Sequence, residues 1–165
     1  VSYKRVDLAI KACGQLGKKL IVIGSGSQES ELKTLASKYR KADIKFTGRI
    51  NDEEVKVYLQ KCRAMIFSAE EDFGIIPVEC QACGRPVIAF GKGGALETVK
   101  ENTTGIFFQE QNEESLKEAI VRFEKLEGEG TFKTTVIVEH AQKFSAERFR
   151  RELQAVIDET LKEVN

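Results

Sequence analysis

The sequence lacks a net charge, a long apolar run and a dense set of cysteines. Its 165 residues hold 26 Lys and Arg against 26 Asp and Glu, a balance that argues against a nucleic-acid binder or a polybasic membrane adaptor. No run approaches the ~18 apolar residues that a membrane span needs. Four cysteines are too few for a secreted disulfide scaffold, and no signal-peptide pattern opens the chain, so we expect a cytoplasmic protein.

The sequence is also poor in groups that bind metal ions. It holds one histidine, His140, and no Asp-x-Asp pair. Cys80 and Cys83 have the spacing of a metal or redox pair, but a zinc site needs a second pair or histidines. We therefore expect no metal, and we interpret both cysteines as buried free thiols that behave as small apolar groups on a helix. His140 is expected on the flank of a helix, without a chemical role.

Short apolar runs alternate with helical patterns along a length that suits one domain. The runs cover 20–23, 44–46, 64–67, 87–89 and 105–108, and are typical of strands buried on both faces of a parallel sheet. Apolar residues with a 3.6 period predict helices at 6–16, 32–36, 55–59 and 115–125, and the chain closes in helices at 134–143 and 145–164. We expect one α/β domain, residues 1–165, with a Rossmann-like, doubly wound parallel sheet.

A loop with two carboxylates follows the predicted strand at 64–67. Doubly wound folds bind ligands at this carboxyl edge of the sheet. Glu71 falls in the loop, and Glu79 falls in the first turns of a helix whose start is suited to Pro77. The two carboxylates could accept hydrogen bonds from the hydroxyls of a sugar or ribose. A solvated acidic loop is the alternative, and composition alone favours it.

A second loop, after the strand at 87–89, contains Gly93 and Gly94 ahead of a helix start. Backbone N–H groups and the helix dipole could face a phosphate there, and a flexible turn is an equal alternative. It is not a Walker loop, because no Lys-Ser/Thr pair follows. Gly24 and Gly26 resemble the start of a dinucleotide fingerprint, but Glu29 occupies the third glycine position, which disfavours a dehydrogenase cofactor domain.

Taken together, these segments resemble the C-terminal, nucleotide-sugar-binding domain of retaining family 4 glycosyltransferases, which have the GT-B fold. The two glutamates seven residues apart around Phe73-Gly74 are the best-known mark of that family. The blocks that carry the resemblance cover roughly residues 1–125 and occur in the family order, at 3–7, 24–26, 46–50, 71–79, 82–89, 93–99 and 102–105. The opening Tyr3-Lys4-Arg5 and the run at 70–77 resemble mannosyltransferases that use GDP-mannose.

The resemblance implies a role for each matching residue. Glu71 would be the catalytic carboxylate that contacts the transferred sugar. The donor-binding residues would be Lys4 for the diphosphate, Gly48, Arg49 and Ile50 for the base, Phe73, Gly74 and Ile75 for the sugar, Glu79 for the ribose, and Gly93 and Gly94 on the donor side of the cleft. No metal or other cofactor is implied, because a lysine and helix N-termini can stabilise the leaving diphosphate.

The implied function is transfer of a sugar, with mannose the expected one, from a nucleoside diphosphate sugar to a glycan or lipid-linked acceptor. The family's N-terminal acceptor domain, and a strand with an arginine ahead of Lys4, have no counterpart in this sequence. We therefore expect the donor-binding part of a longer enzyme that works at the inner face of the membrane, and expect it to be inactive alone. A standalone nucleotide-binding or regulatory module without catalysis is the alternative.

Overall fold

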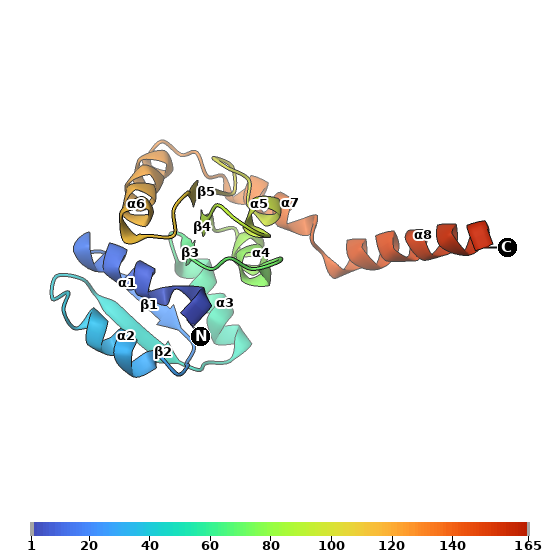
Figure 1. Ribbon diagram of the computed structural model, residues 1–165. Helices are drawn as coiled ribbons and strands as arrows, with labels where there is room; N and C mark the ends of the chain where they lie inside the picture. Colours follow the sequence, from blue (N-terminus) through green and yellow to red (C-terminus); the bar gives the residue numbers. More distant parts are fainter. Residues whose placement is uncertain (1, 165) are drawn as a thin grey trace.

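The computed structural model describes residues 2–164, in which strands and helices alternate along most of the chain (Figure 1). A 3-10 turn, η1 (Ser2–Lys4), precedes the first helix. The other elements are, in chain order, α1 (Val6–Gln15), β1 (Leu20–Ile23), α2 (Glu29–Ala36), β2 (Ile44–Gly48), α3 (Asp52–Lys61), β3 (Met65–Phe67), α4 (Ile75–Ala82), β4 (Val87–Phe90), α5 (Ala95–Thr98), β5 (Gly105–Phe108), α6 (Glu113–Gly128), α7 (Thr134–Gln142) and α8 (Ala146–Val164). The strands fall on the predicted apolar runs, and helices occupy the predicted intervals.

The strands form two parallel sheets. β1 pairs with β2, while β3, β4 and β5 form a second sheet in that order. Parallel neighbours require a crossover connection, and helices supply it in each case. The α/β class with parallel strands is therefore confirmed. A single continuous sheet is not confirmed, because the hydrogen bonds among residues 2–164 place β1 and β3 in separate sheets.

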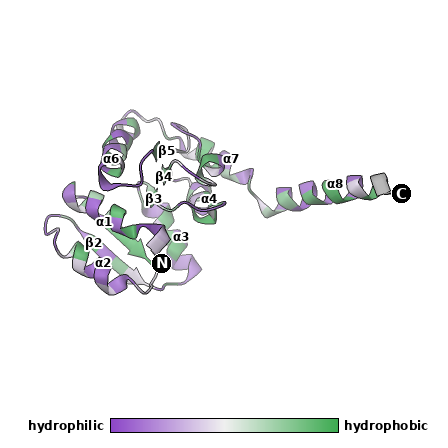
Figure 2. Cartoon of the chain, in the orientation of Figure 1, coloured by the Kyte–Doolittle hydropathy of each residue, from purple (hydrophilic) through white to green (hydrophobic). Residues whose placement is uncertain are grey.

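Burial differs between the two sheets. All four residues of β4 are buried, and in β5 one of four is half-buried. β1 is equally apolar in sequence (Figure 2), yet none of its residues is buried and Ile23 is 37% exposed. The prediction of strands buried on both faces is right for β4 and wrong for β1. Pairing is not the reason, since within residues 2–164 β5 also has one neighbouring strand and is mostly buried. Helices α4 and α6 pack on β4, and α6 also packs on β5, so these two strands are covered.

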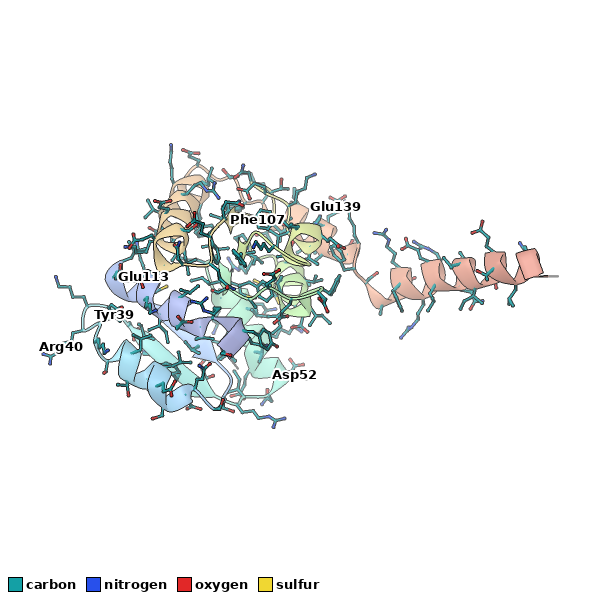
Figure 3. The ribbon with its side chains drawn as sticks, in the orientation of Figure 1. Tyr39, Arg40, Asp52, Phe107, Glu113 and Glu139 are labelled. Atoms are coloured by element: carbon teal, nitrogen blue, oxygen red, sulfur yellow. The ribbon has the colours of Figure 1, made fainter. Side chains whose placement is uncertain are left out.

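The larger core lies where α1 and α6 pack on β4 and β5. Both helices repeat small and apolar residues on one face, which is the pattern that buries a helix against a sheet. The buried members are Leu8, Ala12, Cys13, Ile88, Phe90, Ile106, Phe108, Leu116, Ala119, Ile120 and Phe123. On its outer side α1 accepts an aromatic ring, because Gly14 leaves room for Tyr39, a residue labelled in Figure 3.

The last helix, α8, projects from the body of the molecule (Figure 1). Its start was predicted at Ser145, and the Ser145 Oγ accepts a hydrogen bond from the backbone N–H of Arg148 at 3.3 Å. Apolar side chains recur on one face of α8 and are 42–64% exposed, namely Phe149, Leu153, Val156 and Ile157. Across residues 2–164, we find no helix with both the length and the apolar character that crossing a bilayer requires.

Leu116 and Val121 test the assignment of the core within one helix, α6. Leu116 is fully buried and Val121 is 54% exposed. We expect Leu116→Ala to lower the free energy of unfolding by about 2–5 kcal/mol, because it leaves a cavity in the core. Val121→Ala should change it by less than about 0.5 kcal/mol. Urea unfolding followed by circular dichroism measures both, and equal effects would contradict this placement of α6.

Candidate functional site

Two loops and the turn before α1 meet at the carboxyl ends of β3 and β4. Lys4 closes the turn η1, and Glu71 lies in the loop between β3 and α4. The Lys4 Nζ lies 3.9 Å from the Glu71 Oε1, and these side chains are 41% and 24% exposed. The structure therefore brings together two residues that the sequence analysis assigned to one site, and leaves both within reach of a ligand from solvent.

Glycine allows the turn after β4 to lie directly against the Glu71 loop. A Cβ atom on Gly93 would lie 2.5 Å from the carbonyl oxygen of Glu71, and Gly93 has a φ of +59°. A Cβ atom on Gly94 would overlap the backbone of Asp72 and Phe73. The N–H of Gly94 donates to the Glu71 carbonyl at 2.8 Å. The Gly93-Gly94 turn thus holds the loop through backbone contact.

Several backbone N–H groups that were predicted to bind a phosphate already donate to carbonyl oxygens of the chain. The N–H groups of Gly91, Lys92 and Gly94 donate to the carbonyl oxygens of Phe108, Phe90 and Glu71. The following helix, α5, has four residues, too few for a substantial helix dipole. A phosphate bound at this turn would have to accept hydrogen bonds from groups other than these three N–H groups. The direct consequence of the two glycines in the structure is the position of the Glu71 loop.

The start of α4 lies next to the same loop. Gly74 is the N-cap residue with a φ of 74°, and it makes no side-chain hydrogen bond to the first turn. It is buried against the ring of Phe67, where a Cβ atom would lie 3.1 Å from the ring. Ile75, the first residue of α4, is 62% exposed. Because Gly74 has no side chain that could cap the helix, the first N–H groups of α4 receive no hydrogen bond from the N-cap residue.

An aromatic contact from the C-terminal part of the chain supports the loop on its outer side. The ring of Phe73 meets the ring of Phe144 edge-on, with 5.8 Å between centroids, and Phe144 meets His140 in the same way at 5.6 Å. The His140 Nε2 lies 3.1 Å from the carbonyl oxygen of Thr98. Burial lowers the pKa of His140. His140 lies on α7, as predicted, and helps to position the residues behind the site.

Four other predicted site residues make no hydrogen bond to Lys4 or Glu71 within residues 2–164, namely Gly48, Arg49, Ile50 and Glu79. Gly48 ends β2 with a φ of 68°, and its carbonyl accepts from the N–H of Gly24 at 2.9 Å. The next two residues, Arg49 and Ile50, are exposed and half-buried. Glu79 is exposed on α4. Among residues 2–164, no hydrogen bond or ion pair of the Glu79 carboxylate is present, so it is available to a ligand.

The cysteines are free thiols. Cys80 is buried, and its hydrogen bond with Cys62 together with burial raises the pKa of its thiol. Cys83 is half-buried, so the prediction of two buried thiols is right for Cys80 and wrong for Cys83. Within the described part of the chain, no three His, Cys, Asp or Glu side chains are grouped in a way that could hold a metal ion.

Two residues near the site were missed by the sequence analysis. Phe144 carries no motif, and its contact with Phe73 joins distant parts of the chain. Gln111, between β5 and α6, donates from Nε2 to the carbonyl oxygen of Ser68 at 2.9 Å, at the end of β3. Ser68 is 4% exposed, and its hydroxyl has no hydrogen-bond partner among residues 2–164. No local signal in the sequence indicates either contact.

Comparison with known proteins identifies a family that covers most of this chain. Residues 1–146 match the family described as "Glycosyl transferases group 1". A GDP-mannose-dependent monoacylated alpha-(1-6)-phosphatidylinositol monomannoside mannosyltransferase of Corynebacterium glutamicum is 33% identical, over 73% of this chain and 35% of its own length. An uncharacterized glycosyltransferase of Methanocaldococcus jannaschii is 32% identical with the same two coverages.

Solved structures show the same fold. A glycosyltransferase from Rickettsia africae superposes with a TM-score of 0.86 and 24% identity, over 98% of this chain and 46% of that one. Anabaena HepE in complex with UDP and glucose gives a TM-score of 0.82 and 20% identity, over 96% of this chain and 45% of that one. The Rossmann-like α/β fold expected from the sequence is thereby confirmed.

The chain belongs to the group 1 glycosyl transferase family. It spans about one third of the length of the curated relatives that it matches.

Gly94→Ala tests whether the Gly93-Gly94 turn holds the loop. The φ of −62° at Gly94 would suit alanine, so any cost comes from the overlap with Asp72 and Phe73. We expect the free energy of unfolding to fall by about 1–3 kcal/mol, with faster amide hydrogen exchange in the Glu71 loop. Gly128→Ala is the matched control, because it has open space at the end of α6. Unchanged exchange in the loop of Gly94→Ala would contradict the assignment.

Proposed function

We propose that this chain binds the nucleoside diphosphate sugar donor of a retaining glycosyltransferase, and that the donor is GDP-mannose. The observation that supports the proposal is the Lys4–Glu71 pair at the carboxyl edge of the β3–β5 sheet. Lys4 would neutralise the diphosphate, and Glu71 would accept a hydrogen bond from a hydroxyl of the transferred sugar. Membership of the family supports a sugar-transfer role.

The pair is well suited to give way to a ligand. At 3.9 Å and with both side chains partly exposed, the ion pair is of the kind that contributes about 0–1 kcal/mol. A diphosphate can therefore replace Glu71 as the partner of Lys4 at little cost. The carboxylate is then released toward the sugar, while the loop backbone stays fixed by the Gly93-Gly94 turn.

The rest of the donor would extend along the same edge. The unpaired carboxylate of Glu79 would accept hydrogen bonds from the ribose hydroxyls, which are among the stronger contacts because the acceptor is charged. The loop of Gly48, Arg49 and Ile50 would support the base. The backbone amides of Phe73, Gly74 and Ile75, at the uncapped start of α4, would face the sugar.

Two observations lead us to propose guanine as the base and mannose as the sugar of the donor. The opening Tyr3-Lys4-Arg5 resembles mannosyltransferases, and the related proteins of Corynebacterium glutamicum and Mycobacterium tuberculosis are named as GDP-mannose-dependent. Other proteins of this fold have been solved with UDP. We propose further that no metal takes part, that a separate acceptor-binding domain is required, and that transfer to a glycan or lipid-linked acceptor takes place at the inner face of the membrane.

Calorimetric titration with GDP, UDP, ADP and their sugars tests donor binding. We expect GDP-mannose to bind, with or without EDTA, and Glu79→Gln to weaken binding by tenfold or more, since a charge-assisted hydrogen bond contributes about 1.5–3 kcal/mol. Glu139→Gln is the control, because Glu139 is an exposed glutamate of α7 (Figure 3). Unchanged affinity in a folded Glu79→Gln variant would remove Glu79 from the site.

A transfer assay tests whether sugar transfer needs a second domain in addition to the donor-binding chain. Positioning of donor and acceptor can supply ~7–11 kcal/mol of the barrier, so we expect residues 1–165 alone to bind donor without transferring sugar. Joined to an acceptor-binding domain, the chain should transfer with retained anomeric configuration, and Glu71→Ala should abolish most of that activity. Transfer by residues 1–165 alone would refute the need for a second domain. Full activity of Glu71→Ala would refute the role of Glu71. If the chain joined to the acceptor-binding domain binds donor but transfers no sugar, a regulatory module is indicated instead.

A further inference from the structure

Arg5 has an unusual backbone conformation beside the candidate site. Its φ of 47° and ψ of 41° are left-handed, a region that disfavours residues other than glycine. It joins η1 to α1 and so fixes the direction of η1, and of its last residue Lys4, relative to the helix. Its backbone is tied on both sides, because its N–H donates to Ser2 and its carbonyl accepts from Leu8.

The guanidinium of Arg5 is bound on two sides. Its Nε and Nη2 donate to the two carboxylate oxygens of Asp7, at 3.1 and 3.4 Å. Burial raises the pKa of Asp7, but hydrogen bonds and charge attraction from Arg5 and Lys11 outweigh this effect and hold it below the usual value. Asp7 is therefore an anion at neutral pH, and it offsets the charge of Arg5.

The third contact of Arg5 leads to the end of β3, the strand that precedes the Glu71 loop. Its Nη1 donates to the Oε1 of Gln111 at 3.2 Å, and Gln111 in turn donates from Nε2 to the carbonyl oxygen of Ser68 at 2.9 Å. Ser68 is buried directly after β3, three residues before Glu71. One chain of hydrogen bonds therefore begins next to Lys4 and ends just before Glu71.

From this arrangement we infer that Arg5 and Gln111 are positioning residues that hold Lys4 at the correct distance from Glu71. The inference rests on the proposed function, in which those two side chains bind the diphosphate and the sugar. A neutral amide in the middle of the chain makes both ends rigid without adding charge to the site. Arg5 acts through Lys4 and is not itself a ligand of the donor, since its guanidinium is already occupied by Asp7 and Gln111.

Two variants from different elements test this inference. Arg5→Gly removes the guanidinium and keeps the left-handed backbone without strain. Gln111→Ala breaks the same chain of hydrogen bonds and leaves Arg5 in place. Arg63→Ala is the control, because Arg63 is paired with two carboxylates, Glu124 and Glu127, through ion pairs outside this chain of hydrogen bonds. Circular dichroism and urea unfolding establish that each variant is folded.

The first measurement is affinity for the diphosphate that the unaltered chain binds best among GDP, UDP and ADP, and for its monophosphate. We expect each variant to weaken diphosphate binding by about five- to tenfold, to change monophosphate binding less than twofold, and the double variant to be no weaker than either single one. Equal losses for both nucleotides would indicate a merely structural role and overturn the inference. Loss in Arg5→Gly alone would overturn it in favour of direct contact with phosphate.

The second measurement needs no ligand. The nuclear Overhauser contact between the side chains of Lys4 and Glu71 should be present in the unaltered chain and in Arg63→Ala, and lost in Arg5→Gly and Gln111→Ala. If no nucleotide binds the unaltered chain, the proposed function fails, and loss of this contact still supports the positioning role. Persistence of the contact in both folded variants would overturn the inference, whatever the nucleotide titrations show.

Discussion

The approach of the Gly93-Gly94 turn to the backbone at 71–73 is the constraint on which the site depends. β3 and β4 are parallel neighbours, so the loops that follow them leave the sheet at the same edge. Adjacent loops would normally be separated by their side chains. Two glycines remove that separation, and a hydrogen bond from Gly94 to Glu71 then fixes the position of the loop backbone. The carboxylate of Glu71 lies 3.9 Å from Lys4 on a loop whose backbone is held by this hydrogen bond.

The charges around the start of α1 suit an anionic ligand. Lys4, Arg5 and Lys11 carry three positive charges, and Asp7 carries one negative charge in the same turn region. The N-terminal end of α1 adds the positive end of a helix dipole. Asp7 pairs with Arg5 and Lys11 at 3.1 and 3.4 Å, whereas Lys4 pairs with Glu71 at the longer distance of 3.9 Å. The residue with the longest of these three ion pairs, Lys4, is therefore the one that faces the carboxyl edge of the sheet.

The strands could be predicted from the sequence because each one is a short apolar run closed by polar residues or glycine. The division into two sheets could not, since β1 and β4 are equally apolar and differ in the number of strands beside them. Lys4 and Glu71 were predicted through resemblance to a family, and the structure brings them together. The contacts of Phe144 and Gln111 join segments far apart in the chain, and no local pattern marks a residue whose role depends on such a partner.

The junction between α7 and α8 links the site to the projecting helix. Phe144 places its ring against Phe73 in the site loop, and the next residue, Ser145, caps the start of α8. Two consecutive residues therefore fix both the outer face of the loop and the direction in which α8 leaves the body. An aromatic edge contact of this kind is worth about 0.5–1.5 kcal/mol beyond its buried area, enough to couple the two positions. The exposed apolar face of α8 is thus attached to the molecule at the point where the chain also supports the residues around Glu71.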